Sequence, residues 1–172
     1  SAQVAGTKDQ AYSKKMTPTQ LTESEALELL AQQYGLTEQL SALPGERDRN
    51  FQLCLANGEK NTFKLVSADV PLESLKVEIQ AMQHLNSVLG NLAPQPLADQ
   101  AGHFISQGNL QNGSSCWLRL QSWQPGIPLA EFRPHTTELF HSVGHLMGKV
   151  ATLLSTLAVP DPHPDLPWHP DQ

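Results

Sequence analysis

The stretch Leu43-Pro44-Gly45-Glu46-Arg47-Asp48-Arg49-Asn50-Phe51 decides the fold that this sequence predicts. Proline, glycine and polar residues interrupt an apolar run here, which is typical of a turn. Apolar residues then alternate up to Asn57-Gly58, the dipeptide that most strongly favours a tight hairpin. The return strand is expected at Thr62 to Ser67 and carries Lys64. A polar turn between alternating strands, with a lysine on the next strand, is a pattern that can bind phosphate groups. It indicates a nucleotide-binding function.

Length and composition narrow the class of protein. The chain has 172 residues, of which 39% are hydrophobic and 16% are charged, so one domain of ordinary size with a real core is expected. The net charge of −6 and a pI near 5.6 give no basic surface for nucleic acid. No apolar run reaches the roughly 18 to 20 residues that span a bilayer, and no signal peptide is evident. A cytoplasmic location, with no membrane partner, is therefore expected.

The elements on either side of the hairpin predict an α+β fold with an antiparallel sheet of about five strands. Helical spacing with a capping box predicts a first helix at Thr22 to Gly35, and an apolar stripe predicts a second at Pro71 to Leu89. Two further strands are expected at His103 to Ser106 and Cys116 to Trp123, and a third helix at Thr136 to Leu157. The order favours one helix packed on the sheet.

The termini and the cysteines carry less information. Residues 1–20 are expected to be a flexible tail, either a linker from a longer protein or sequence preceding a start codon at Met16. The proline-rich segment Val159 to Gln172 is not expected to form regular structure. Cys54 and Cys116 stand singly, so we interpret them as small buried hydrophobic residues.

These parts together resemble the N-terminal half of the aminoglycoside phosphotransferase and choline kinase-like family, especially its hydroxylysine kinase-like branch. The resemblance rests on Tyr34-Gly35-Leu36 at a helix end, on the turn Gly45 to Phe51, and on Phe63-Lys64-Leu65. It implies a protein-kinase-like N-lobe at residues 21–124. Residues 125–172 would then be the hinge and the start of a second lobe.

The resemblance implies that Lys64 contacts the phosphates of ATP or GTP, oriented by a carboxylate from the following helix. Glu78 is favoured for that carboxylate because it flanks the buried stripe of the helix. Glu73 lies in the first helical turn, where a negative charge complements the helix dipole. The alternative is that Lys64 and Glu78 are solvated surface residues.

The turn lacks the G-x-G-x-x-G pattern of protein kinases, so charge would have to replace close backbone wrapping of the phosphates. Arg47 and Arg49 are the candidates for that charge. Asn50 could bond the backbone of its own turn. Gly45 and Asn50 would equally serve any turn.

Two more segments contain candidate site residues. By the same resemblance, Gln121, Ser122 and Trp123 are hinge residues whose backbone would meet the adenine, although Trp123 could instead be a core aromatic. His141 and His145 are spaced i, i+4 on a helix, as metal ligands can be. No carboxylate or thiolate motif completes such a set, so structural histidines are expected and no metal site is assigned.

Phosphoryl transfer also needs a base-positioning aspartate and Mg²⁺ ligands, which in this family lie in the second lobe. The sequence has no H-x-D loop with the following asparagine, so we interpret the chain as a truncated N-terminal portion without catalytic residues of its own. The expected function is the nucleotide-binding lobe of a kinase that phosphorylates an alcohol group. The alternative is a non-catalytic regulatory domain of a longer chain, such as a fusion to a class III aminotransferase, where pyridoxal phosphate would be a cofactor. The missing lobe, a fused domain or a second copy of the chain are the expected partners.

Overall fold

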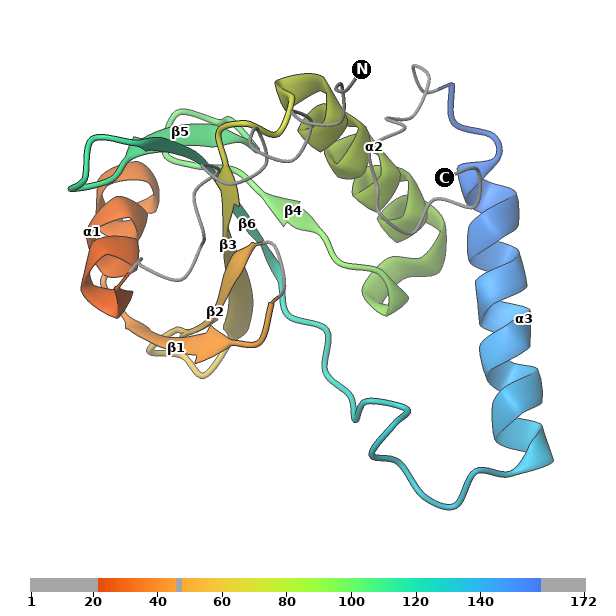
Figure 1. Cartoon of the computed structure of the whole chain (residues 1–172). Coiled ribbons are helices and arrows are strands. Elements are labelled where there is room, and N and C mark those ends of the chain that lie inside the picture. The colour runs from red at the N-terminus through yellow and green to blue at the C-terminus, as the bar shows by residue number, and fades with distance from the viewer. Residues whose placement is uncertain (1–21, 46–47, 159–172) are drawn as a thin grey trace, which may run out of the picture.

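The computed structural model describes residues 22–45 and 48–158, which form one antiparallel sheet with helices on both faces (Figure 1). The helices are α1 (Glu23–Tyr34), α2 (Leu72–Leu89), the 3₁₀ turn η2 (Gly90–Leu92) and α3 (Thr137–Leu154). The strands are β1 (Gln39–Leu43), β2 (Arg49–Cys54), β3 (Lys60–Ser67), β4 (Pro96–Leu97), β5 (Ser106–Asn109) and β6 (Ser115–Ser122). The predicted α+β class is confirmed, with six strands where about five were expected.

The sheet is built around β3 and β6, which pair along nearly their whole length. The strand order is β1-β2-β3-β6, and the far edge of β6 pairs with β5 and then with β4. All of these pairings are antiparallel. The hairpin between β2 and β3 turns at the predicted Asn57-Gly58, where Gly58 has the positive φ of 85° that such a turn requires. β3 is therefore a central strand, held on both edges.

Helix α1 covers one face of the sheet, and local sequence sets its ends. Thr22 Oγ1 accepts from Glu25 N while the Glu25 carboxylate accepts from Thr22 N, as the capping box predicted. Gly35 ends the helix at a φ of 70°. The buried residues of α1 and alternate residues of the strands share one apolar core, whose members are Ala26, Leu29, Leu30, Tyr34, Leu40, Phe51, Leu53, Phe63, Leu65, Cys116, Leu118 and Leu120.

Tyr34 in this core gives the protein a predictable response to alkaline pH. Burial raises the pKa of its hydroxyl from about 10 to about 12. Because the unfolded chain ionises first, the stabilisation is complete below about pH 10 and is lost as the pH rises through about 12. We expect Tyr34→Phe to reduce the fall in the free energy of unfolding between about pH 8 and about pH 11.5 by about 2 kcal/mol. Urea denaturation of both proteins at the two pH values measures this. An equal fall in the free energy of unfolding in the two proteins would contradict it.

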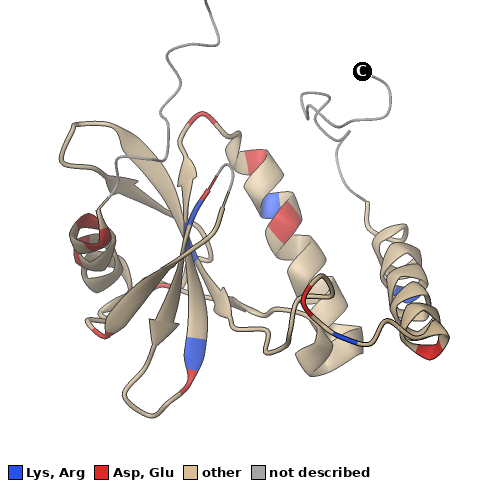
Figure 2. Cartoon of the chain, turned by 60° about the horizontal axis from the view of Figure 1, so that its bottom comes forward, with Lys and Arg blue, Asp and Glu red and all other residues tan. Residues whose placement is uncertain are grey.

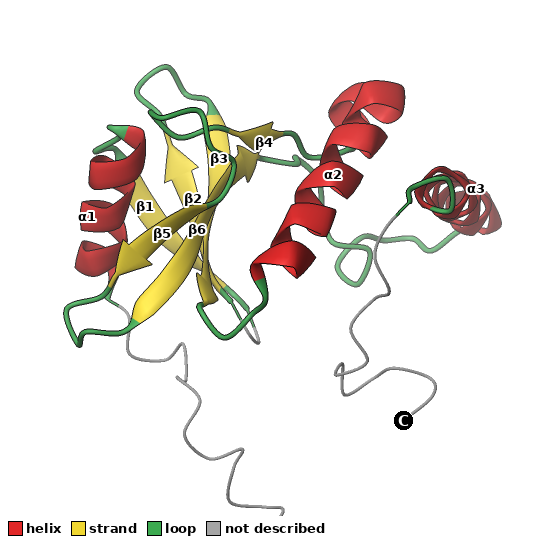
Figure 3. Cartoon of the chain, turned by 90° about the horizontal axis from the view of Figure 1, so that it is seen from above, coloured by secondary structure: helices red, strands yellow, loops and turns green. Residues whose placement is uncertain are grey.

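Helix α2 covers the opposite face of the sheet (Figure 3). It buries Leu75, Ile79 and Leu89, which belong to the predicted apolar stripe. Trp117 on β6 donates its indole N–H to the carbonyl oxygen of Val70 at 3.0 Å, which fixes the start of the helix to the sheet. The two faces thus differ in composition, because the face toward α1 is apolar and the face toward α2 carries polar residues.

Strands β1 and β4 were not predicted, and their sequences explain why. In β1 only Leu40 is buried, so the segment shows no clear alternation. β4 has two residues, of which Pro96 has no N–H to donate to a neighbouring strand. Strands this short and irregular are specified by their partners, β2 for β1 and β6 for β4.

The strand expected at His103 to Ser106 is displaced, and β5 begins at Ser106. Asp99 is the cause, because its Oδ1 accepts hydrogen bonds from the N–H groups of Ala101 and His103 and holds that segment in a turn. Within β5, Gly108 is required by close packing. A Cβ placed there would lie 2.9 Å from Leu29 Cδ2.

The two cysteines differ in burial. Cys116 is buried as predicted, and burial raises the pKa of its thiol to about 11. The prediction was wrong for Cys54, which is exposed at the end of β2.

A linker after β6 leads to α3, which contacts α2 (Figure 1). Thr136 caps α3 by accepting from Leu139 N, and beyond its end Thr156 Oγ1 lies 3.2 Å from His84 Nε2 on α2. Phe140 and Met147 are exposed. Among the described residues, no helix combines the length and the apolar character needed to cross a membrane. The expected N-terminal tail and the proline-rich segment lie outside the described ranges.

Candidate functional site

The centre of the polar face is a row of three side chains on neighbouring strands. Asn50 on β2 lies opposite Lys64 on β3, and Lys64 lies opposite Arg119 on β6. Residues directly opposite each other in a sheet point to the same face. Figure 2 shows basic positions in the middle of the sheet and both acidic and basic positions on α2. The row therefore faces the side of the sheet that α2 covers.

Lys64 is paired with the turn that precedes β2. Its Nζ lies 3.2 Å from Asp48 Oδ2, and the two side chains are 23% and 25% exposed. Lys64 therefore lies on a central strand, and its side chain is still partly exposed to solvent. Its amine can meet an anionic ligand on this face.

Glu78 does not orient Lys64, contrary to our expectation. Its Oε2 accepts a hydrogen bond from Arg119 Nη1 at 2.5 Å, while Lys64 is paired with Asp48. The physical reason is that Arg119 is 2% exposed and would otherwise be a buried charge without a counterion. Arg119 is the site residue that sequence analysis missed. A single charge within the apolar strand Cys-Trp-Leu-Arg-Leu was the available signal.

The turn itself is tight. A Cβ placed on Gly45 would lie 2.5 Å from the carbonyl oxygen of Asp48 and 2.7 Å from Asn50 Nδ2, so only glycine fits without rearrangement. Asn50 Oδ1 is buried and accepts no hydrogen bond from any described residue, so the expected bond to its own turn through this oxygen is not seen. A buried acceptor without a partner, beside an amine, is a feature that a ligand donor could satisfy.

Of the two arginines proposed to supply charge, Arg49 is not brought to this row. Arg49 alternates with Asn50 along β2, and its guanidinium lies 5.8 Å from the ring centroid of Phe51, a residue of the α1-side core. It therefore lies on the face opposite Lys64. Arg47 lies outside the described residues.

Comparison with known proteins adds one finding. No family model matches the sequence, and no curated protein matches it. Among solved structures the chain is similar to amicoumacin kinase hAmiN in complex with AMP-PNP, Ca²⁺ and Ami, with a TM-score of 0.67 and 20% sequence identity. The match covers 84% of this chain and 43% of that chain. The chain has a kinase-like fold. It spans less than half the length of the kinase chain that it matches.

The three residues expected to form the hinge lie at the end of β6 and directly beyond it. The backbone N–H and the hydroxyl of Ser122 both bond the segment before β4. The N–H donates to Gln95 O at 2.9 Å, and Oγ accepts from Gln95 N at 2.9 Å. Trp123 N donates to Lys60 O at 3.3 Å, and its side chain is half-buried. Gln121 lies opposite Thr62 and two residues beyond Arg119, on the polar face. Of the two hinge candidates within β6, Gln121 lies on the same face of the sheet as Lys64 and Ser122 on the opposite one.

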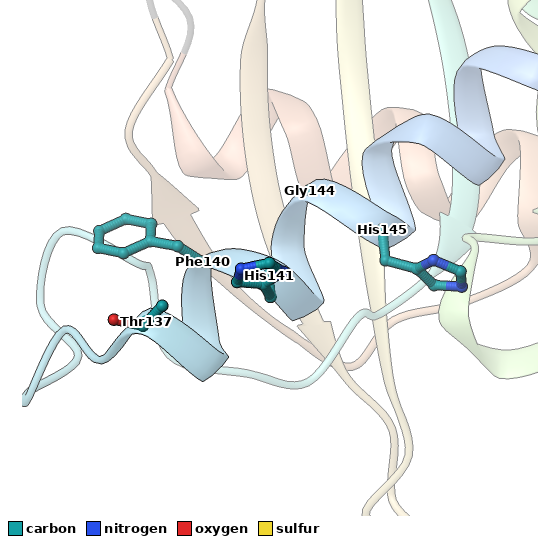
Figure 4. Close-up of a pocket in the computed structure, with 5 residues that line it drawn as sticks. All are labelled: Thr137, Phe140, His141, Gly144 and His145. Atoms are coloured by element: carbon teal, nitrogen blue, oxygen red, sulfur yellow. The ribbon is translucent and has the colours of Figure 1, made fainter.

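A shallow pocket on α3 lies apart from this row (Figure 4). It is lined by Thr137, Phe140, His141, Gly144 and His145. Both histidines are exposed, and the described part of the chain contains no group of three or more His, Cys, Asp or Glu residues that could hold a metal ion.

Proposed function

We propose that this chain is the nucleotide-binding lobe of a kinase-like domain. The observation that carries the proposal is the placement of Lys64: it lies on a central strand, opposite a buried arginine and beside a glycine-dependent turn. A polyphosphate needs a positive charge in a fixed position, and a lysine on a central strand supplies one. The kinase-like fold supports the same assignment, and so does the AMP-PNP named with the similar kinase.

The residues divide into two groups along the polar face. Lys64 would contact the phosphates, and Asn50 Oδ1 would accept a hydrogen bond from the ligand or its bound water. Gln121 and the backbone of Trp123 would lie toward the base. Ser122 would not contact the nucleotide directly. Its polar groups are bonded to Gln95, so it would hold β4 in place beside the site. Mg²⁺ would arrive with the nucleotide, and we assign it no ligand among the described residues.

For the whole domain, we propose transfer of a phosphoryl group from ATP or GTP to an alcohol group of a small molecule. The base and the metal ligands would come from a second lobe, of which residues 125–172 would form the start and 21–124 the nucleotide side. A cytoplasmic location and association with that lobe or with a second copy belong to the same proposal. No described residue bears on a fused class III aminotransferase or its pyridoxal phosphate, so neither enters it.

The test is binding of Mg²⁺–ATP to the wild-type chain and to Lys64→Met by titration calorimetry. We expect saturable binding in the wild type and a dissociation constant at least about tenfold higher in the variant, because a charge-assisted phosphate contact is lost. Lys149→Met on α3 is the matched control, since it removes the same charge from an exposed position. Equal affinity for Mg²⁺–ATP in all three proteins would show that Lys64 does not contact the nucleotide.

One observation favours a non-catalytic domain instead. Lys64 is paired with Asp48 of the preceding turn and not with a carboxylate of α2, which departs from the arrangement expected of a nucleotide-binding lobe. In that case neither Mg²⁺–ATP nor Mg²⁺–GTP would bind to the wild-type chain at millimolar concentration.

A further inference from the structure

The two cations of the polar row are each paired with a carboxylate, so two positive and two negative charges lie close together. Lys64 and Arg119 lie opposite each other on β3 and β6, and Asp48 and Glu78 each bond one of them. The local net charge is therefore close to zero. A polyphosphate that enters this site gains little from the two cations unless one carboxylate gives way, because each carboxylate repels it.

Burial decides which carboxylate gives way. Arg119 is 2% exposed, so loss of Glu78 would leave a buried charge without a counterion. Lys64 and Asp48 are both partly exposed, and water can solvate either group when the pair separates. The pair between Lys64 and Asp48 is consequently the one that a ligand can replace.

The turn places this carboxylate where an anionic ligand would sit. The Asp48 carbonyl oxygen is packed against Gly45, and the Asp48 carboxylate occupies a position 3.2 Å from the Lys64 amine. A phosphate oxygen that bonds the same amine needs a position at about the same distance. The two anions would then be close neighbours, and their repulsion can be relieved only if Asp48 moves away.

We propose that Asp48 is an intramolecular competitor for Lys64, whose carboxylate must leave the amine before a nucleotide phosphate binds. This inference rests on the proposed function and adds a residue that lowers nucleotide affinity. It predicts that a substitution in the site raises the affinity for nucleotide. Removing a charged group from the site strengthens binding, whereas damage to the turn would weaken it.

The experiment compares the dissociation constants of Mg²⁺–ATP and of tripolyphosphate for the wild-type chain and Asp48→Asn, at low salt and at about 0.5 M NaCl. Asparagine keeps the size of the side chain and removes its charge. We expect the variant to bind both probes about tenfold more tightly at low salt, with a smaller gain at high salt because exposed charges are screened. Asp48→Glu, which keeps the charge, is expected to bind within about threefold of the wild type.

Glu28→Gln is the matched control, because it removes the same charge from α1 on the opposite side of the sheet, at an exposed position. Its affinity should equal that of the wild type. Wild-type binding with unchanged or weaker binding in Asp48→Asn overturns the role of Asp48 and leaves the nucleotide site intact. Absence of binding in the wild type and in every variant overturns the proposed function, and the role of Asp48 with it.

Discussion

Replacing Glu78 with glutamine is expected to lower the free energy of unfolding by about 2 to 3 kcal/mol. Arg119 is 2% exposed, and its Nη1 donates to Glu78 at 2.5 Å while its Nε has no partner among the described residues. Glutamine keeps the shape of Glu78 but leaves the buried guanidinium without a counterion. Breaking a buried pair costs more in general, but the Glu78 side chain is 54% exposed, so water compensates part of the loss. Urea denaturation at neutral pH measures the change.

Two further variants separate the ion pair from general damage to α2. Glu73→Gln removes a carboxylate that pairs with Lys76 at the exposed surface, and its cost should stay below about 0.5 kcal/mol. In the double variant Glu78→Gln with Arg119→Met, the buried charge is gone, and we expect part of the stability to return. If Glu78→Gln alone matches the wild type, Arg119 has another source of compensation and the pair is not what fixes α2 to the sheet.

The hairpin and the mounting of Lys64 could be predicted because their signals are local. Asn57-Gly58 marks a tight hairpin whose loop is Ala56-Asn57-Gly58, closed by the bond from Leu55 N to Glu59 O. The register of a hairpin follows from the length of its loop, and here it sets Lys64 opposite Asn50. The same alternation also carried information that was not used. Arg49 and Asn50 are consecutive on one strand and must point to opposite faces, so both could not serve one site.

The partner of Glu78 could not be predicted in this way. Glu78 and Arg119 are 41 residues apart, and their contact depends on how α2 packs against the face of the sheet that carries Arg119. The choice between Lys64 and Arg119 as the partner is energetic and is decided by burial, because the more buried cation has the greater need of a counterion. β4 is a similar case, since a two-residue strand exists only through its pairing with β6.

Replacing Phe63 with alanine is expected to cost about 3 to 5 kcal/mol of the free energy of unfolding. Phe63 precedes Lys64 on β3, is 0% exposed, and meets the ring of Tyr34 edge-to-face at a centroid distance of 5.9 Å. Alanine would open a cavity between α1 and the central strands and would remove the aromatic contact. Small domains are stable by only about 5 to 15 kcal/mol, so this variant could lie close to its unfolding midpoint in water.

Phe63→Leu keeps the effect measurable if the alanine variant does not fold. It fills most of the volume, and we expect a loss of about 1 to 2 kcal/mol by urea denaturation. Leu92→Ala removes an apolar side chain that is 69% exposed and should change stability by less than about 0.5 kcal/mol. Comparable losses at Phe63 and Leu92 would mean that the core between α1 and the sheet is not what holds β3. The same packing gives Lys64 its fixed position, because the side chain that precedes it in the strand anchors β3 from the opposite face of the sheet.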